Sequence, residues 1–292
     1  MKPTFSDYLE LTKPRLSLLS VLTALVGYLA ARPAHDPWRL IWVVVGTSLA
    51  AGGVASLNQW LEVDTDSRMA RTAARPLPAG KIATGSAFVI GCLMCIAALM
   101  LIFARVGPLP ALFTLLTIAT YLGWYTPSKR TSRWSTEIGA IAGAFPPLIG
   151  WTAGSGEVTA LGLVLFGILF FWQVPHFMAI AWIYRQDYTA VHFPMPTVTD
   201  ETGLLAARWS FGNTLLLVTV SLLPVALGLD TLWYGAAALA SGGYFLWRAG
   251  VFLFCRDRDK AARRLFLASI AYLPVALAAL VADRILFFPP LP

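Results

Sequence analysis

Nine long apolar stretches constrain this chain more than any other feature of its sequence. A helix of about 20 residues, rising 1.5 Å per residue, crosses a hydrocarbon core of about 30 Å. Unpaired backbone groups are too costly in lipid, and the stretches lack the alternation of barrel strands, so each is predicted to be a helix. The sequence therefore predicts an all-α integral membrane protein with nine transmembrane helices. These lie near 15–32, 40–61, 83–104, 108–126, 135–152, 158–184, 211–229, 231–254 and 263–288.

Composition agrees with a membrane location. The chain is 58% apolar and 13% charged, with a mean hydropathy of +0.68, whereas soluble domains carry about 25% charged residues. No soluble segment separates the stretches, so we expect one polytopic domain over 1–292 and no nucleic-acid partner. The segment before the first stretch is too acidic for a signal peptide, and "FSDYLELTKPR" is predicted to form a short interfacial helix.

Positive charge indicates the orientation. Counted from an inside N-terminus, the inside segments hold most Lys and Arg residues, and the outside segments hold only Arg32, Arg39 and Arg105. This distribution predicts a cytoplasmic N-terminus and, with nine crossings, an outside C-terminus. The inside residues are Lys2, Lys13, Arg15, Arg68, Arg71, Arg75, Lys81, Lys129, Arg130, Arg133, Arg185, Arg208, Arg256, Arg258, Lys260, Arg263 and Arg264.

A polar stripe ends the second stretch on the inside. Asn58, Glu62 and Asp66 are spaced four residues apart, which places them on one face of a helix. One interpretation is a helix end that frays into water, and Asp64 fits that description. The other is a Mg²⁺ site, because Mg²⁺ takes oxygen ligands from one or two carboxylates and shares them with a substrate phosphate.

A basic turn follows the stripe at once. Arg68, Arg71, Arg75 and Lys81 are interrupted by proline and glycine in "RMARTAARPLPAGK". A diphosphate bridged by Mg²⁺ would satisfy both the carboxylates and the guanidinium groups. The two adjacent charge clusters therefore predict a diphosphate site at the membrane surface.

Two further clusters lie on the inside face. The sixth stretch places Gln173 and His176 within the helix, and Tyr184, Arg185 and Asp187 at its mouth, with Pro175 expected to loosen the helix. His176 is either an interhelical hydrogen-bonding residue or a catalyst, and Asp187 is either a surface partner of Arg185 or a further metal ligand.

"YTPSKRTSR" ends the fourth stretch with Tyr125, Lys129 and Arg130, which are either topology charges or diphosphate ligands. In the fifth stretch, Gly139, Gly143 and Gly150 allow close packing, and Pro146 and Pro147 interrupt the backbone hydrogen-bond ladder, which suggests a helix that lines a cavity.

The segment "LNQWLEVDTDSRMARTAARPLPAGKI" resembles the diagnostic motif of protohaem IX farnesyltransferases, the haem O synthases of the intramembrane prenyltransferase superfamily. That motif is Asn-x3-Glu-x3-Asp followed by Met-x-Arg-Thr-x2-Arg-Pro-Leu, and the resemblance extends over about residues 8–200. It departs from the family pattern at Val191 and His192 and at Pro196 and Thr197, and only Asp187 represents the second acidic group.

The resemblance implies nine helices around a central cavity, in which a Mg²⁺-dependent enzyme transfers farnesyl from farnesyl diphosphate to a vinyl group of haem B, giving haem O. It implies Asn58, Glu62, Asp66 and Asp187 as metal ligands and His176 as a further catalytic residue. The other partners it implies are membrane lipid and haem-modifying or oxidase-assembly proteins. The expected location is the cytoplasmic (inner) membrane, with the active site facing the cytoplasm.

The alternatives to farnesyl transfer to haem B are prenyl transfer to an aromatic acceptor and a transporter. The substrate-binding candidates are Arg68, Arg71, Arg75, Lys81, Tyr125, Lys129, Arg130, Gln173, Tyr184 and Arg185.

Overall fold

The computed structural model describes residues 3–31 and 36–289, and in these ranges every regular element is helical. The predicted all-α fold is confirmed. Lys2 and Arg32, which entered the charge count above, lie outside the described residues. The helices are α1 (Phe5–Leu11), α2 (Pro14–Ala31), α3 (Pro37–Leu61), α4 (Val63–Asp66), α5 (Thr84–Arg105), α6 (Pro108–Ala119), the π-helical turn η1 (Thr120–Tyr125), α7 (Thr126–Thr131), α8 (Ser135–Ser155), α9 (Ala160–Ile183), α10 (Arg185–Ala190), α11 (Pro196–Thr199), α12 (Leu204–Ala226), α13 (Leu232–Phe254) and α14 (Arg258–Phe287).

Eight helices in the described part of the chain are long and apolar enough to cross a membrane, with Pro108–Thr131 counted as one. The stretch predicted at 135–152 forms the 21-residue helix α8, which is not among the eight. Ser, Thr and Glu at its start, and glycines and prolines inside it, keep the hydropathy of α8 below that of the eight candidate spans. The count of nine crossings therefore stays a prediction.

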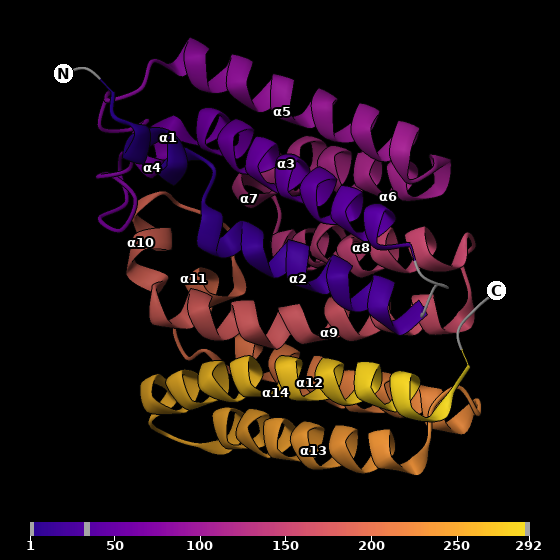
Figure 1. Cartoon of the computed structure of the whole chain (residues 1–292). Helices are drawn as coiled ribbons and strands as arrows, with labels where there is room; N and C mark the ends of the chain where they lie inside the picture. The colour runs from indigo at the N-terminus through magenta and orange to yellow at the C-terminus, as the bar shows by residue number, and fades with distance from the viewer. Residues whose placement is uncertain (1–2, 32–35, 290–292) are drawn as a thin grey trace.

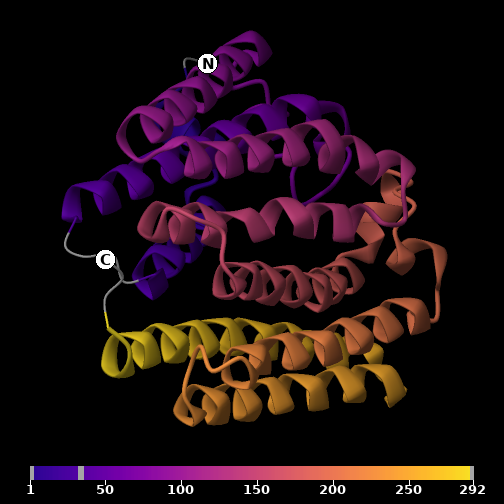
Figure 2. The ribbon, with the colours of Figure 1, turned by 90° about the vertical axis from the view of Figure 1, so that its right-hand side faces the viewer.

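The long helices lie side by side, with α5 at one edge of the bundle and α13 at the other (Figures 1 and 2). Helix α8 is in the interior, where it packs against α2, α6 and α9. Helix α9 in turn packs against α12 and α14, and both of these contact α13. The helices α1, α4, α10 and α11 gather at one end, whereas α14 ends at the opposite end (Figure 1).

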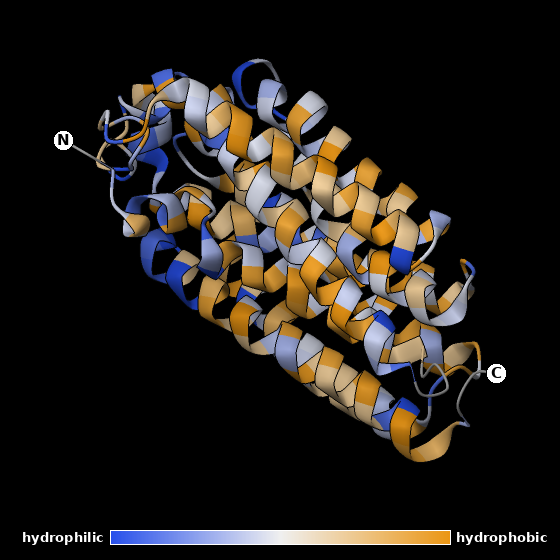
Figure 3. Cartoon of the chain, turned by 45° about the horizontal axis from the view of Figure 1, so that its top comes forward, coloured by the Kyte–Doolittle hydropathy of each residue, from blue (hydrophilic) through white to orange (hydrophobic). Residues whose placement is uncertain are grey.

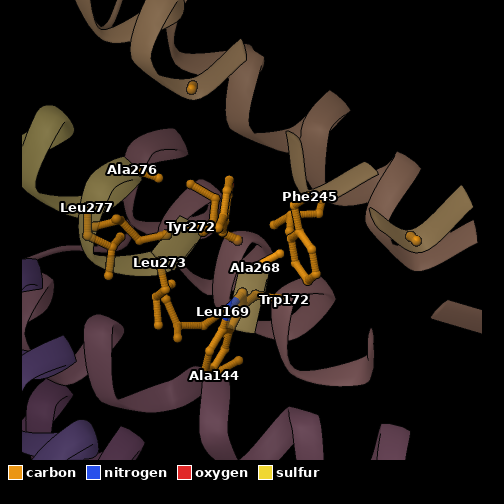
Figure 4. Packing of buried hydrophobic residues seen from close by; sticks show 14 of the residues in the cluster. Ala144, Leu169, Trp172, Phe245, Ala268, Tyr272, Leu273, Ala276 and Leu277 are labelled. Atoms are coloured by element: carbon orange, nitrogen blue, oxygen red, sulfur yellow. The ribbon is translucent and has the colours of Figure 1, made fainter. Parts of the chain in front are cut away.

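The largest hydrophobic core joins α9 to the last three long helices. Figure 4 shows Trp172 and Leu169 of α9 packed among Phe245 of α13 and Tyr272 and Leu273 of α14. The Trp172 indole donates a hydrogen bond to the Ser269 carbonyl at 2.8 Å, so its polar atom is satisfied inside the core. This packing fixes α9, whose C-terminal end leads into the site described below.

Small residues let α2 and α8 approach closely. A Cβ added at Gly150 would collide with the Ala24 carbonyl, and one added at Gly27 would collide with the Pro147 carbonyl. The expected close packing at Gly150 is therefore present. Helix α8 continues through Pro146 and Pro147, neither of which has an N–H to donate to the backbone ladder. Close contacts with α2 hold the turn in which proline removes a backbone donor.

Hydrophilic residues gather at the end of the bundle that carries α1, whereas the helix bodies are mainly hydrophobic (Figure 3). The predicted interfacial helix is α1, which begins with a capping box between Thr4 and Asp7. Leu11 of α1 is fully buried against Leu77 and Ile82 of the loop 67–83. Helix α1 therefore packs directly on the basic turn identified in the sequence.

Candidate functional site

The polar stripe lies at the polar end of the bundle and is buried. Asn58 is in the last turn of α3, Glu62 links α3 to α4, and Asp66 ends α4. Their exposed fractions are 1%, 6% and 2%. The interpretation of this stripe as a frayed helix end in water is therefore wrong. Among the three acids of this segment, only Asp64, which is off the stripe, is exposed.

Each member of the stripe binds a different cationic side chain. The Lys13 ammonium donates to Asn58 Oδ1 at 2.8 Å, Lys129 Nζ lies 2.8 Å from Glu62 Oε1, and Arg75 Nη1 lies 2.7 Å from Asp66 Oδ2. The Asn58 amide also donates to Glu62 Oε2 at 2.8 Å, which ties two members of the stripe together. Three chain segments remote in sequence thus converge on one set of oxygen atoms.

The loop 67–83 reaches back over the stripe because buried residues anchor it. Met69 and Leu77 are 5% and 3% exposed. The fully buried Thr72 donates its hydroxyl hydrogen to the Asp66 carbonyl at 2.8 Å. The loop motif therefore has two parts, in which Met69, Thr72 and Leu77 fix the backbone while the arginines between them extend toward acidic groups.

Arg71 connects this loop to the sixth predicted span. Its Nε lies 3.9 Å from Asp187 Oδ2 of α10, and its guanidinium lies over the Tyr184 ring at 5.4 Å. The acids of the second span, the arginine loop and the sixth-span aspartate are therefore linked through Arg71 and Arg75. Asp187 forms no ion pair with Arg185, because residues two apart on a helix face different directions.

A π-helical turn shapes the opposite wall of the site. Here η1 widens the helix that begins as α6, and such turns are rare and frequent at functional sites. It places Tyr125 beneath the Lys129 ammonium, which lies 4.5 Å from the ring centroid. Just after η1, the Thr126 hydroxyl accepts a hydrogen bond from the Asn58 amide at 3.3 Å. Both Asn58 and Lys129 are therefore oriented by this segment.

The electrostatics of the site reflect crowding of cations. Burial raises the pKa of Glu62, but Lys129, Lys13 and the Asn58 amide together offset this and leave the pKa below its ordinary value. Burial, followed by the neighbouring Arg75, lowers the pKa of Lys13 to about 7. An anion bound among these side chains would relieve the repulsion between them.

Several candidates lie outside this buried cluster. Arg130 pairs with the exposed Asp64 at 2.6 Å, and Lys81 pairs with Asp7 of α1 at 3.4 Å. Arg185 pairs with Asp259 of α14 at 3.1 Å. Arg68 is exposed and has no ion pair within the described ranges.

Gln173 and His176 face neighbouring helices. Gln173 donates to the carbonyls of Ala140 and Leu169 at 3.3 and 2.9 Å. The His176 ring shares a 2.7 Å hydrogen bond with the Ser269 hydroxyl and stacks on Trp172. The interhelical alternative for His176 matches these contacts, and neither residue touches the acidic stripe in the interactions described.

Sequence reasoning missed three residues of the site. Lys13 was counted only as a topology charge, although "TKPR" places it at the mouth of the first span. Thr72 was noted within the motif without a role. Thr126 had no signal, because its position opposite Asn58 depends on the π-helical turn.

The chemistry of the stripe fits a divalent cation. Its oxygen atoms are buried, lie on one helix face, and already bind positively charged donors at 2.7–2.8 Å. No group of three His, Cys, Asp or Glu residues that could hold a metal occurs in the part of the chain described. Two carboxylates and an amide are nevertheless a typical protein share for Mg²⁺, which obtains its remaining ligands from water and phosphate.

An apolar groove of about 370 Å³ lies elsewhere, between α5 and α6. Its lining residues include Met100, Phe103 and Leu112, and nothing in it could bind a diphosphate. The charged cluster, rather than this groove, is the candidate site.

The chain is a bundle of long apolar helices with buried acids and a basic loop at one end. The chain belongs to the UbiA prenyltransferase family, whose model matches residues 20–270. A curated relative from Opitutus terrae, named Protoheme IX farnesyltransferase, is 69% identical over 281 residues, covering 96% of this chain and 95% of the relative. A relative of the same name from Solibacter usitatus is 39% identical, covering 95% and 98%. These relatives confirm the resemblance inferred from the motifs.

Solved structures share the fold at low sequence identity. A structure of digeranylgeranylglyceryl phosphate synthase superposes with a TM-score of 0.82 at 16% identity, covering 96% of this chain and 98% of that one. A UbiA homologue from Archaeoglobus fulgidus, solved with GPP and Mg²⁺, gives a TM-score of 0.68 at 12% identity, covering 94% and 99%. These two similarities show the fold.

Proposed function

We propose that this protein transfers the farnesyl group of farnesyl diphosphate to a vinyl group of haem B, forming haem O and releasing pyrophosphate. The names of relatives up to 69% identical support this reaction. The observation that carries it structurally is the buried cluster in which Asn58, Glu62 and Asp66 each bind a separate cationic side chain at 2.7–2.8 Å.

The reaction begins with rupture of the allylic C–O bond, which leaves a delocalised carbocation and pyrophosphate. We assign Asn58, Glu62, Asp66 and Asp187 to hold Mg²⁺, which would act as a Lewis acid toward the leaving group. Arg75, Arg71 and Lys129 would exchange their carboxylate partners for phosphate oxygens, acting as preorganised donors. The A. fulgidus homologue solved with Mg²⁺ supports the use of a divalent metal, and the four ligands are our own assignment.

The second half of the reaction joins carbon to carbon. The vinyl π electrons of haem B attack the farnesyl cation, and water captures the resulting cation with loss of one proton, which gives the hydroxyl of haem O. Overall, haem B, farnesyl diphosphate and water give haem O, pyrophosphate and a proton. The Tyr125 ring lies 4.5 Å from the Lys129 ammonium, beside the proposed diphosphate position, and would stabilise positive charge there.

The direct test is haem O formation by the purified full chain. The protein in lipid nanodiscs would be incubated with haem B, labelled farnesyl diphosphate and Mg²⁺, and the haem products separated by chromatography. We expect labelled haem O and an equal amount of pyrophosphate, both abolished by a chelator. Prenylation of 4-hydroxybenzoate without haem O would favour an aromatic acceptor, and absence of pyrophosphate release would favour a transporter.

We also propose that α8 makes a ninth crossing and that the polar end faces the cytoplasm of the inner membrane. Helix α8 is 21 residues long and packs between α2 and α9, both of them apolar enough to span. The loop 67–83, which carries Arg68, Arg71 and Lys81, packs on α1, and basic residues at this end are expected for an inside face. The comparisons offer no support for the protein partners expected from the sequence, and we do not propose them.

A further inference from the structure

Lys13 has an unusual place in the fold. It lies between α1 and α2, donates its backbone N–H to the Glu10 carbonyl, and accepts from the N–H groups of Leu16 and Ser17. Its φ is +46°, a left-handed conformation that favours glycine and that is uncommon for a lysine. The residue before a proline, here Pro14, ordinarily adopts an extended conformation. A lysine is therefore held where the backbone favours a residue without a side chain.

The side chain shows what this position achieves. From the turn between the two helices, the ammonium reaches Asn58 Oδ1 at 2.8 Å. Asn58 is 1% exposed and 45 residues away in sequence. An amide oxygen is a neutral acceptor, whereas the other two cations of the cluster, Lys129 and Arg75, are paired with carboxylates. Lys13 is thus the cation of the stripe whose partner carries no net charge.

We propose that Lys13 is a diphosphate-binding residue whose ammonium covers the Asn58 ligand oxygen until Mg²⁺ takes that oxygen, and then binds a phosphate oxygen. This inference rests on the metal and diphosphate site proposed above. Asn58 Oδ1 cannot make its closest contact with Mg²⁺ and with an ammonium at once. Displacement is favourable only when an anion arrives with the metal, so Lys13 couples the binding of metal to the binding of diphosphate.

The test measures the two ligands separately on the purified full chain in detergent. Mn²⁺, followed by its paramagnetic resonance signal, reports on the metal site without diphosphate. Inorganic pyrophosphate, titrated by calorimetry at saturating Mg²⁺, reports on the anion site. The variants are Lys13→Gly, which suits the left-handed backbone, and Lys13→Met, which keeps the length of the side chain. Lys260→Met is the matched control, because Lys260 is exposed and pairs only with Asp257 among the interactions described.

We expect both Lys13 variants to bind Mn²⁺ about tenfold more tightly and pyrophosphate about tenfold more weakly, because one nearby charge typically shifts an ionic equilibrium by at least one pKa unit. The control should leave both constants unchanged, and thermal unfolding of Lys13→Gly should occur at or above the wild-type temperature. A purely structural role would weaken both ligands together, and that result, or two unchanged constants, overturns the inference. If wild-type protein binds Mn²⁺ normally, such a result leaves the proposed function standing, whereas absence of Mn²⁺ binding in wild-type protein overturns both.

Discussion

Asp66 is the acidic residue on which the proposed chemistry depends most directly. Its side chain is 2% exposed and pairs with Arg75, while its carbonyl accepts the Thr72 hydroxyl hydrogen. We expect Asp66→Asn to lower haem O formation on the order of a hundredfold or more, since loss of a metal ligand exceeds the effect of losing its outer partners. The measurement is product per mole of folded enzyme. Asp64→Asn, an exposed acid two residues away, is the control and should retain wild-type turnover.

Thr72 holds the loop 67–83 in place and has no assigned part in the chemistry itself. Thr72→Val removes the hydrogen bond to the Asp66 carbonyl and leaves a buried acceptor unpaired, at a cost of about 1–3 kcal/mol. We expect a higher KM for farnesyl diphosphate, because the loop backbone that carries Arg71 and Arg75 is no longer held in place. Thr72→Ser, which keeps the hydroxyl, should restore most of the loss. Equal KM values for the Val and Ser variants would contradict this role.

At the scale of elements, the contact between α2 and α8 depends on the absence of a side chain at one position. Gly150→Ala would place a Cβ 1.7 Å from the Ala24 carbonyl oxygen, so the helices must separate. We expect the unfolding temperature in detergent to fall, because overpacking in a close-packed interior typically costs about 1–3 kcal/mol. Gly212→Ala, in α12, is the control, because nothing lies within 4 Å of the added atom. An unchanged unfolding temperature for Gly150→Ala would refute the close packing.

Asp259 of α14 is the hydrogen-bond and ion-pair partner of residues at and just after the C-terminal end of α9. The Trp182 indole donates to Asp259 Oδ1 at 2.8 Å, and Arg185 pairs with the same carboxylate. Asp259→Ala should therefore release Arg185 and loosen the junction between α9 and α14. We expect faster hydrogen exchange in α10, measured by mass spectrometry. Asp257→Ala, whose ion pair with Lys260 is local, should leave that exchange unchanged.

At the scale of the whole molecule, the proposed number of crossings determines which loops face outward. If α8 crosses the membrane, its two ends lie on opposite sides. We expect a cysteine at Glu157 to react with an impermeant maleimide added to intact cells, and a cysteine at Thr131 to react only after the membrane is opened. Cys92, Cys95 and Cys255 would first be replaced by alanine. Equal labelling at the two positions would exclude a crossing by α8.

Much of the architecture follows from local sequence. The apolar stretches match helices within a few residues for the spans ending at Leu61, Arg105 and Phe254. Larger differences occur at polar ends, where α12 begins at Leu204 rather than near 211. There the Asp200 carboxylate accepts from the backbone of Leu205, so the helix continues beyond the apolar segment. Hydrophobicity predicts which residues lie in lipid, but hydrogen bonding decides where a helix ends.

The sequence by itself determined the helical membrane fold, the acidic stripe and the basic loop, because all three depend on residue types at short, regular spacings. Only the tertiary structure decided the partners. Asn58 binds Lys13, Arg71 reaches Asp187, and Arg185 turns away toward Asp259. Such pairs join separate helices, and which side chains meet depends on how those helices pack. No periodicity within a single helix records that packing.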